Sequence, residues 1–318
     1  MIKPILSIII VSYNTKKLTL DCLRSVFADK SLSFNLKKPK SNSTIPTEII
    51  VVDNASSDDS VSALKKVKNI HLLKNQKNIG FALANNQAYK IAKGNFILLL
   101  NSDTLILHSS ISQSLTWLSS HPEASVCTAQ LLNSDKSIQS SGGFFPNLLN
   151  VFTWSFGLDD LPFINQLVPP LHPHPPQFYT HDRFFLKDHP QDWVTGAYML
   201  IRKSALSHTG LFDKNYFMYG EEVELSYRIK QNNPQTQTWY LIGPQIIHFG
   251  GASAKSKVDP ILNEYRGILS FFKKHRPSGQ YQLVKTILKI NARLRALFYL
   301  LTLKPKSFKI YQQACFQF

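Results

Sequence analysis

The stretch that decides the fold is ILLLNSD, residues 97–103, an apolar run that ends in a carboxylate. Gly94 and Asn95 precede it, and such a run is typical of a buried strand in a parallel sheet. Asn101 and Asp103 then follow the carboxyl end of the strand, where open α/β sheets bind ligands. A carboxylate there can hold Mg²⁺ or Mn²⁺ against a diphosphate, because these cations suit hard oxygen ligands. The alternative is a plain Asn-Ser-Asp turn.

The segments around this strand alternate between strand and helix patterns. Apolar, β-branched runs predict strands at residues 6–11, 48–52, 70–73 and 96–100, and helical spacing predicts helices at residues 15–27, 57–66 and 79–93. This β-α-β-α-β order predicts an α/β fold with a doubly wound parallel sheet. Residues 142–192 are rich in Pro, Phe and His, which predicts an irregular surface segment.

The net charge of +16 is concentrated in the C-terminal part of the chain. Residues 265–318 contain eleven Lys or Arg and no Asp or Glu, whereas residues 1–264 hold 25 basic against 20 acidic residues. Residues 281–301 predict an amphipathic basic helix, whose charges argue against a membrane-spanning segment. Two interpretations stay open for this helix: it lies on an anionic membrane surface, or it packs on the rest of the protein with a solvated basic face.

Several blocks of sequence occur in a characteristic order. They are SIIIVSYN (7–14), VVDNASSD (51–58), NIGFALANN (78–86) leading to NSD (101–103), GAYMLIR (196–202), FDKNYFMYGEEVELSYR (212–228) and HFGG (248–251). Together they resemble the family 2 glycosyltransferases with a GT-A fold, and within them the rhamnosyltransferase-like enzymes. The resemblance covers residues 5–255. It implies a Rossmann-like, mostly parallel sheet in a catalytic domain of residues 1–255, with a helical, basic C-terminal extension of residues 256–318.

The first three blocks hold the residues expected to bind a nucleotide-sugar donor. Asp53 ends a predicted strand, so its carboxylate can accept a hydrogen bond from a base or a ribose hydroxyl. The resemblance implies that it recognises a pyrimidine, with Ser12 and Tyr13 lining the base pocket. Asn78 and Gly80 precede a predicted helix, where glycine permits close approach and helix N–H groups favour phosphate. The alternative for Asp53 is that it opens a turn.

The resemblance also assigns the metal ligands. Asp103 occupies the last position of the family's Asp-X-Asp motif, and Asn101 takes the first position, which removes one negative charge. Asp103 is therefore the expected ligand of a divalent cation, Mg²⁺ or Mn²⁺, with Asn101 as a weaker partner in cofactor binding. His248 matches a position that supplies a second ligand in such enzymes, although a histidine near a Gly-Gly turn can also be merely hydrogen-bonded.

Glu221 and Glu222 are the candidate catalytic pair. They precede an apolar-periodic segment and are predicted to open a helix, whose dipole favours acidic residues. Two adjacent carboxylates repel each other, so one pKa can be raised, and a poised carboxylate can act as general base. The family pattern here is usually Glu-Asp with the second residue taking the proton, which implies Glu222 as the base.

The expected function is that of an inverting, metal-dependent glycosyltransferase. It would move a sugar from dTDP-rhamnose or a UDP-sugar to a hydroxyl of a glycan or lipid-linked acceptor in cell-surface polysaccharide synthesis. One alternative is a catalytically silent nucleotide-sugar binder. The other is a nucleic-acid-binding protein that uses the basic tail, but the sequence contains no nucleic-acid-binding motif. Three widely spaced cysteines and no signal-peptide pattern predict a cytoplasmic protein, with the inner face of the cell membrane as a peripheral site.

Overall fold

The structure is a computed structural model that describes all residues except 1, 38–43, 162, 177–182, 251–259 and 318. The chain divides into two compact units. The first, here the sheet unit, comprises Met1–Gly142 and His174–Lys255, and the second, the helical unit, comprises Gly143–Pro173 and Ser256–Phe318. Residues 143–173, which we expected within the catalytic domain, therefore belong with the C-terminal helices.

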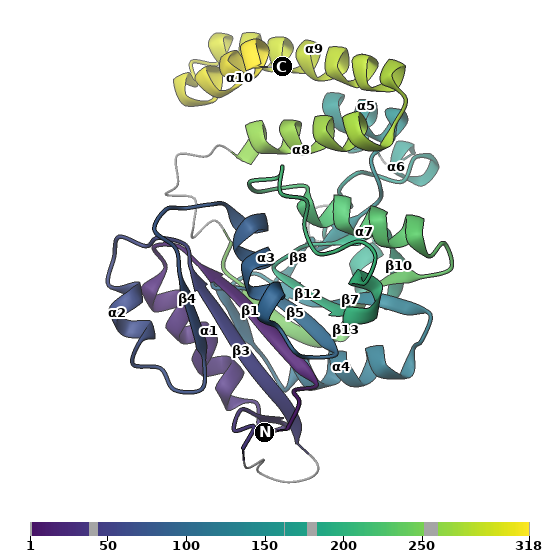
Figure 1. Ribbon diagram of the computed structural model, residues 1–318. Helices are drawn as coiled ribbons and strands as arrows, with labels where there is room; N and C mark the ends of the chain where they lie inside the picture. Colours follow the sequence, from purple (N-terminus) through teal and green to yellow (C-terminus); the bar gives the residue numbers. More distant parts are fainter. Residues whose placement is uncertain (1, 38–43, 162, 177–182, 251–259, 318) are drawn as a thin grey trace. The chain divides into compact units, whose positions relative to one another are not determined.

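Parallel strands form the part of the sheet that carries the first three sequence blocks (Figure 1). β5 (Phe96–Asn101), β1 (Leu6–Ser12), β3 (Ile45–Asp53) and β4 (His71–Lys74) pair in this order, all parallel. β2 (Leu32–Ser33) adds to the start of β3. In the register, Ser12 lies opposite Asp53, and Val11 opposite Asn101, so the carboxyl ends of three strands meet at one edge. Ser12, Asp53 and Asn101 therefore lie at one edge of the sheet, and their roles stay predictions.

Helices cover both faces of these strands, as the predicted doubly wound fold requires. On one face, Ile8 and Ile10 of β1 pack with α1 (Lys16–Ala28) and α4 (Ser110–Ser120). On the other face, Ile9 packs with α3 (Phe81–Ile91) and α7 (Glu221–Asn232). Side chains of a strand alternate between faces, so the apolar run Ile8–Ile10 of β1 contributes to both cores. The short helix α2 (Ser60–Leu64) follows β3 and ends earlier than predicted.

The rest of the sheet is mixed rather than mostly parallel. β12 (Tyr198–Arg202) pairs antiparallel with both β5 and β7 (Ala124–Leu132). β13 (Gln237–His248) runs parallel to β7 and antiparallel to β6 (Thr104–Ile106) and β10 (His189–Gln191). The remaining short elements are β8 (Ile138–Gln139), β9 (Gly142–Gly143), η1 (Phe184–Leu186), β11 (Trp193–Val194) and η2 (Lys203–Leu206).

The helical unit contains α5 (Leu148–Phe156), α6 (Ile164–Leu167), α8 (Pro260–His275), α9 (Ser278–Leu301) and α10 (Pro305–Gln317). The prediction of an irregular segment over 142–192 is wrong for α5. A capping box starts this helix: the Asn147 side chain accepts from the Asn150 backbone N–H, and Asn150 accepts from the Asn147 N–H. Within the described parts of the chain, no helix is long and apolar enough to cross a membrane.

Candidate functional site

A carboxylate and an imidazole meet at the end of β5. Asp103 Oδ1 lies 3.4 Å from His248 Nε2, and Asn101 Nδ2 lies 3.4 Å from the same nitrogen. The pairing of β6 with β13 sets this geometry, because Thr104 lies opposite His248 and the Phe249 N–H donates to the Asp103 carbonyl. The structure thus brings together the three residues predicted to bind the cation, although 145 residues separate Asp103 from His248 in the sequence.

A residue that the sequence analysis missed orients the imidazole. Gln139 Oε1 lies 2.6 Å from His248 Nδ1, so Nδ1 donates this hydrogen bond and Nε2 is the ring nitrogen that faces Asp103. A hydrogen bond on one ring nitrogen commonly fixes a histidine for metal binding through the other. No sequence signal pointed to Gln139, because β8 pairs with β7 only through the fold.

These residues fit a Mg²⁺ or Mn²⁺ ion that completes its coordination with donor phosphates and water. Among the described residues, no group of three or more His, Cys, Asp or Glu could hold a metal ion. One carboxylate and one imidazole are nevertheless enough, because Mg²⁺ usually takes one or two protein carboxylates and relies on substrate phosphates for the rest. Asn101, where the family motif has Asp, adds an amide to this set without adding charge.

Asp53 is almost fully buried at the neighbouring strand end, and its two oxygens differ. Oδ1 accepts from the Ser56 N–H at 3.0 Å, which is the predicted turn. Oδ2 is buried and has no hydrogen-bond partner among the described residues. Buried polar atoms are nearly always paired, so this oxygen is a candidate acceptor for a ligand donor such as a base N–H. The turn and the donor-binding role are compatible, since they use different atoms.

Asn54, the residue after Asp53, organises the loop that leads to α3. Its side chain accepts from Asn75 and the Ile79 N–H, and donates to Asn78 Oδ1 at 2.8 Å. The Gly80 N–H donates to Asn78 Oδ1, and the Phe81 N–H donates to the Phe217 carbonyl. The structure therefore gives Asn78 a place in holding this loop, and the phosphate-binding role of Asn78 and Gly80 stays a prediction.

Glycine is required at position 80 for two reasons. Its φ of +85° lies in the left-handed region, and a Cβ there would lie 2.6 Å from the Phe217 carbonyl oxygen. The close approach lets the loop before α7 pack against the first residue of α3. Gly196 similarly lies against the Phe81 ring.

Ser12, Tyr13 and Trp193 occupy different environments. The Ser12 side chain is fully buried, and its hydroxyl bonds to Thr19 at 2.9 Å within a cluster of hydroxyl groups behind the edge. Tyr13 is half-buried and follows the strand end directly. Trp193 is buried, with 6% of its surface exposed, so it packs in the core rather than offering a face to a sugar.

Glu221 and Glu222 open α7, as predicted. Glu221 is buried, whereas Glu222 is partly exposed. The helix is anchored by Glu224 and Arg228, whose ion pair measures 2.7 Å and whose guanidinium also donates to the Leu211 carbonyl. The Arg228 Nε–H is shared between both oxygens of the buried Glu224 carboxylate, and this charge-assisted contact holds the start of the helix.

Neighbouring loops connect the start of α7 with the end of β5. The start of α3 contacts Phe217, three residues before the helix N-cap Gly220, and Gly196. Next to Gly196, the Ala197 carbonyl accepts from the Asn101 N–H at 3.0 Å. These contacts join the loop that leads to the glutamate pair to the loop that runs beside the predicted metal ligands.

Burial, followed by the charge of Glu222, raises the pKa of Glu221 well above its ordinary value of 4.5. The native protein therefore keeps a proton at Glu221 that the unfolded chain releases above pH 4.5, so this residue lowers stability as the pH rises toward the native pKa. We expect the Glu221→Gln variant to gain stability relative to wild type between pH 5 and 8, by at most about 1.4 kcal/mol per pH unit. Urea unfolding across this range measures the difference.

The control for this prediction is Glu123→Gln, the same change at an exposed glutamate. An equal effect of pH on both variants would mean that Glu221 is not a buried, protonated acid.

Comparison with known proteins agrees with this geometry. The family model Glycosyl transferase family 2 matches residues 7–210, which include both predicted strand-end carboxylates. The chain belongs to this family. Its assignment rests on nearly two thirds of the sequence, and the resemblance inferred from the sequence blocks is confirmed at the level of the family.

The chain is similar to two bacterial rhamnosyltransferases. The chain is 26% identical over 200 residues to the N-acetylglucosaminyl-diphospho-decaprenol L-rhamnosyltransferase of Mycobacterium tuberculosis, a match that covers 58% of this chain and 61% of that protein. It is 28% identical over 144 residues to the rhamnosyltransferase WbbL of Escherichia coli, covering 45% and 48%. The match therefore spans about three fifths of the first relative's length and half of the second's.

Solved structures share the fold. GalNAc-T7 with UDP, GalNAc and Mn²⁺ superposes with a TM-score of 0.54 at 16% identity, covering 84% of this chain and 48% of that one. The TarS fragment of S. aureus in complex with UDP-GlcNAc gives 0.51 at 15% identity, covering 97% and 90%. Both support the α/β fold of the GT-A class for a family 2 chain.

Proposed function

We propose that this family 2 member is an inverting glycosyltransferase. Its donor is a nucleotide-diphosphate sugar, and its acceptor is a hydroxyl of a glycan or lipid-linked saccharide in cell-surface polysaccharide synthesis. The observation that carries the proposal is the convergence of Asp103, Asn101 and an oriented His248 at the carboxyl edge of the sheet, two strands from the unpaired Asp53 oxygen. A nucleoside at Asp53 and a diphosphate at Asp103 would lie along one edge.

Different residues of the site have different roles in the proposed reaction. Glu222 removes the proton from the acceptor hydroxyl, and the acceptor oxygen forms a bond to the anomeric carbon as the bond to the diphosphate breaks on the opposite face. One displacement inverts the anomeric configuration. Asp103 and His248 would hold a divalent cation, which would supply charge stabilisation for the leaving group. Buried Glu221 keeps its proton, so Glu222 carries the base role in this proposal.

The relatives favour a rhamnosyl donor and a lipid-linked acceptor. Two relatives are rhamnosyltransferases, one of which acts on N-acetylglucosaminyl-diphospho-decaprenol. A third, WfaP of Escherichia coli, 32% identical over 118 residues, is a UDP-glucose-dependent transferase with an acceptor on diphosphoundecaprenol. We therefore propose dTDP-rhamnose first and a UDP-sugar second, with a polyprenyl-diphosphate-linked N-acetylglucosamine as acceptor.

A panel assay tests this proposal. Purified protein is incubated with Mn²⁺, polyprenyl-diphospho-N-acetylglucosamine and one radiolabelled donor at a time, and sugar in the lipid fraction is counted. We expect transfer from one donor and a product of inverted configuration by NMR. Binding of a donor without transfer or hydrolysis would favour the silent binder instead, the alternative suggested by Asn101 and by Glu222 in place of Asp.

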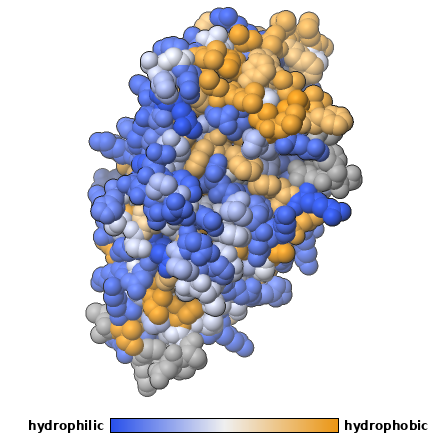
Figure 2. Space-filling view, turned by 90° about the vertical axis from the view of Figure 1, so that its right-hand side faces the viewer, coloured by the Kyte–Doolittle hydropathy of each residue, from blue (hydrophilic) through white to orange (hydrophobic). Residues whose placement is uncertain are grey.

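We further propose that the helical unit contacts an anionic membrane. Helix α9 buries one apolar face, which includes Val284, Leu288 and Ala292, within the unit. A second apolar stripe on the same helix is exposed, and it consists of Leu283, Ile290, Leu294, Leu297, Phe298 and Leu301. Figure 2 shows apolar residues gathered on the exposed surface of this unit. An apolar patch of this extent marks an interaction surface.

The basic charge beside this stripe favours a membrane over another protein as the partner. Beside the exposed stripe, Lys285, Lys289 and Arg293 form a basic row along α9, and no acidic residue follows Glu264 in the sequence. Apolar side chains flanked by basic residues suit the interface of anionic lipids. A membrane is also where a polyprenyl-linked acceptor resides.

Replacing Leu297 and Leu301 together with serine is expected to lower binding to vesicles at least tenfold. These side chains are 53% and 74% exposed, so their loss removes lipid contacts without opening the core. Co-sedimentation with phosphatidylglycerol-containing vesicles gives the measurement. The control, Leu186→Ser, changes a leucine that is 47% exposed and lies outside the helical unit. A wild-type protein that stays in the supernatant would contradict the proposal.

A further inference from the structure

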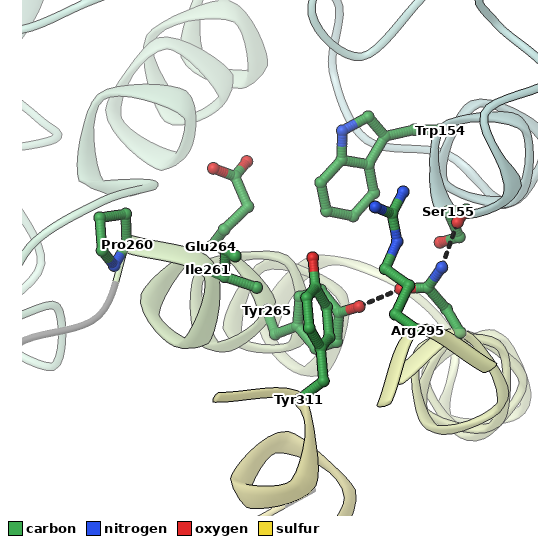
Figure 3. A pocket seen from close by; sticks show the side chains of 9 residues that line it. Trp154, Ser155, Pro260, Ile261, Glu264, Tyr265, Arg295 and Tyr311 are labelled. Atoms are coloured by element: carbon green, nitrogen blue, oxygen red, sulfur yellow. Dashed lines mark hydrogen bonds between the residues drawn. The ribbon is translucent and has the colours of Figure 1, made fainter. Parts of the chain in front are cut away.

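The helical unit contains a cavity of about 280 Å³ that the reaction above does not use (Figure 3). Four helices contribute to its wall. The lining residues are Trp154, Ser155, Pro260, Ile261, Glu264, Tyr265, Asn291, Arg295 and Tyr311. The volume is just below the range of ligand pockets, roughly 300–1,000 Å³, and suits one small ring with its substituents.

Hydrogen bonds fix the base of this cavity. The Tyr265 hydroxyl donates to Asn291 Oδ1, and the Asn291 amide donates to the Ser155 carbonyl. These two hydrogen bonds link α8, α9 and α5 through buried side chains. The cavity wall is therefore held in place by specific contacts between the helices. A preformed site of this kind loses little free energy to ordering when a ligand binds.

Aromatic rings form one wall. Trp154 and Tyr265 are packed edge to face with ring centroids 6.1 Å apart, and Tyr311 adds a third ring. The Arg295 guanidinium carbon lies 5.8 Å from the centroid of the Tyr311 ring, so the cation is held against that wall. Aromatic faces offer dispersion contacts to the C–H groups of a saturated ring while their neighbours bind its polar substituents.

Polar groups of both signs surround the same space, as Figure 3 shows for the Glu264 carboxylate and the Arg295 guanidinium beside the Trp154 ring. Glu264 Oε1 lies 2.7 Å from His172 Nε2. Burial opposes ionisation of Glu264, but the charge and hydrogen bond of His172 lower its pKa below the ordinary value, so the carboxylate stays an acceptor. Among the described residues, no carboxylate forms an ion pair with Arg295, which leaves its donors for a ligand.

A second, independent observation points to a ligand. The Ser155 hydroxyl is buried, with 2% of the residue exposed, and has no hydrogen-bond partner among the described residues. A buried hydroxyl without a partner destabilises the folded protein, and a ligand that bonds to it recovers this cost. Ser155 is one of the residues that line the cavity, so the unpaired hydroxyl lies in the cavity wall, where a ligand can reach it by a small shift of the side chain.

We propose that this cavity is a carbohydrate site that takes one pyranose ring of a glycan. A sugar ring matches every part of it: C–H groups for the aromatic wall, and hydroxyls for the Glu264 carboxylate, the Arg295 guanidinium and the Ser155 hydroxyl. A wholly apolar ligand would bury the Arg295 guanidinium without a hydrogen-bond acceptor, at a high cost. A complete nucleotide-sugar exceeds the volume.

The site deepens the proposed function, because a glycosyltransferase that holds its growing glycan at a second site can retain it between transfers. Only the identity of the glycan as acceptor or product rests on that function. The binding of a sugar ring rests on the cavity itself and is tested separately.

Saturation-transfer NMR and calorimetry test the proposal with methyl α-L-rhamnopyranoside, methyl β-D-glucopyranoside and N-acetyl-D-glucosamine as probes. We expect at least one of these probes to bind the full-length protein. The Arg295→Gln variant should bind that probe with at least tenfold lower affinity. The matched control is Arg293→Gln, the same change at an exposed position two residues away that does not line the cavity. Wild-type protein that binds none of the probes, or equal affinity in the two variants, would overturn the proposal.

Ser155→Ala separates ligand binding from folding. Removing a buried, unpaired hydroxyl is expected to leave thermal stability unchanged or raised, while the affinity for the bound probe falls several-fold. A variant with unchanged affinity would contradict the site. Asp103→Asn distinguishes this proposal from the proposed function: it should greatly lower the rate of transfer and leave probe binding at the cavity intact, so either claim can fail alone.

Discussion

Replacing Glu222 with glutamine is expected to lower kcat for sugar transfer by about 10²–10⁴, the usual contribution of a general base. Glutamine keeps the length and the polarity of the side chain but cannot take the acceptor proton. Glu222 is partly exposed at the start of α7, so the change leaves the core intact. Initial rates at saturating donor and acceptor, with donor affinity measured in parallel, give the comparison.

The conservative variant Glu222→Asp makes this prediction specific. It restores the carboxylate of the usual family pattern one methylene further from the acceptor, and it should keep activity between those of wild type and Glu222→Gln. Donor affinity should stay within about twofold in both variants, because Glu222 acts on the acceptor side. Full turnover in Glu222→Gln would assign the base elsewhere.

Replacing Asp103 with asparagine is expected to lower kcat/KM in the presence of Mn²⁺ by about 10²–10³, on the order found when one group that stabilises developing charge is removed. The change is isosteric, and the Asp103 carbonyl that accepts from Phe249 is retained. The β6–β13 pairing should therefore survive, which circular dichroism and thermal unfolding can check.

The control for Asp103 is Asp135→Asn, which makes the same change at an exposed turn. Chelation of the cation with EDTA should lower wild-type activity to the level of Asp103→Asn, and should lower the activity of this variant little further. A wild-type rate that does not respond to EDTA would mean that Asp103 does not act through a cation.

The parallel half of the fold was predictable because its strands are continuous apolar runs. β1 and β5 are buried on both faces, so their sequences carry no alternation, and each ends in the polar residues of the site. In a parallel sheet the carboxyl ends of the strands lie at the same edge, and this was enough to place Asp53 beside the end of β1. The antiparallel direction of β12 could not be predicted, because a buried strand in a mixed sheet has the same composition as one in a parallel sheet.

Local sequence predicts the residues at the strand ends, but not the contacts that strand pairing creates between them. The contact of Asp103 with His248 depends on the pairing of β6 with β13, so it followed from family resemblance and not from spacing. Gln139 and the partition of residues 143–173 into the helical unit depend on packing alone. The start of α5 did have a local signal, the Asn147 and Asn150 capping box, which the abundance of proline and histidine in this segment outweighed.

Pulsed EPR of Mn²⁺ bound with UDP or dTDP tests the central claim most directly. The account predicts that either nucleotide tightens Mn²⁺ binding to the protein and that the bound ion shows the nitrogen coupling of an imidazole. This coupling should be lost in His248→Gln, and the tightening should be lost in Asp103→Asn. A Mn²⁺–nucleotide complex without imidazole nitrogen, identical in wild type and both variants, would contradict it.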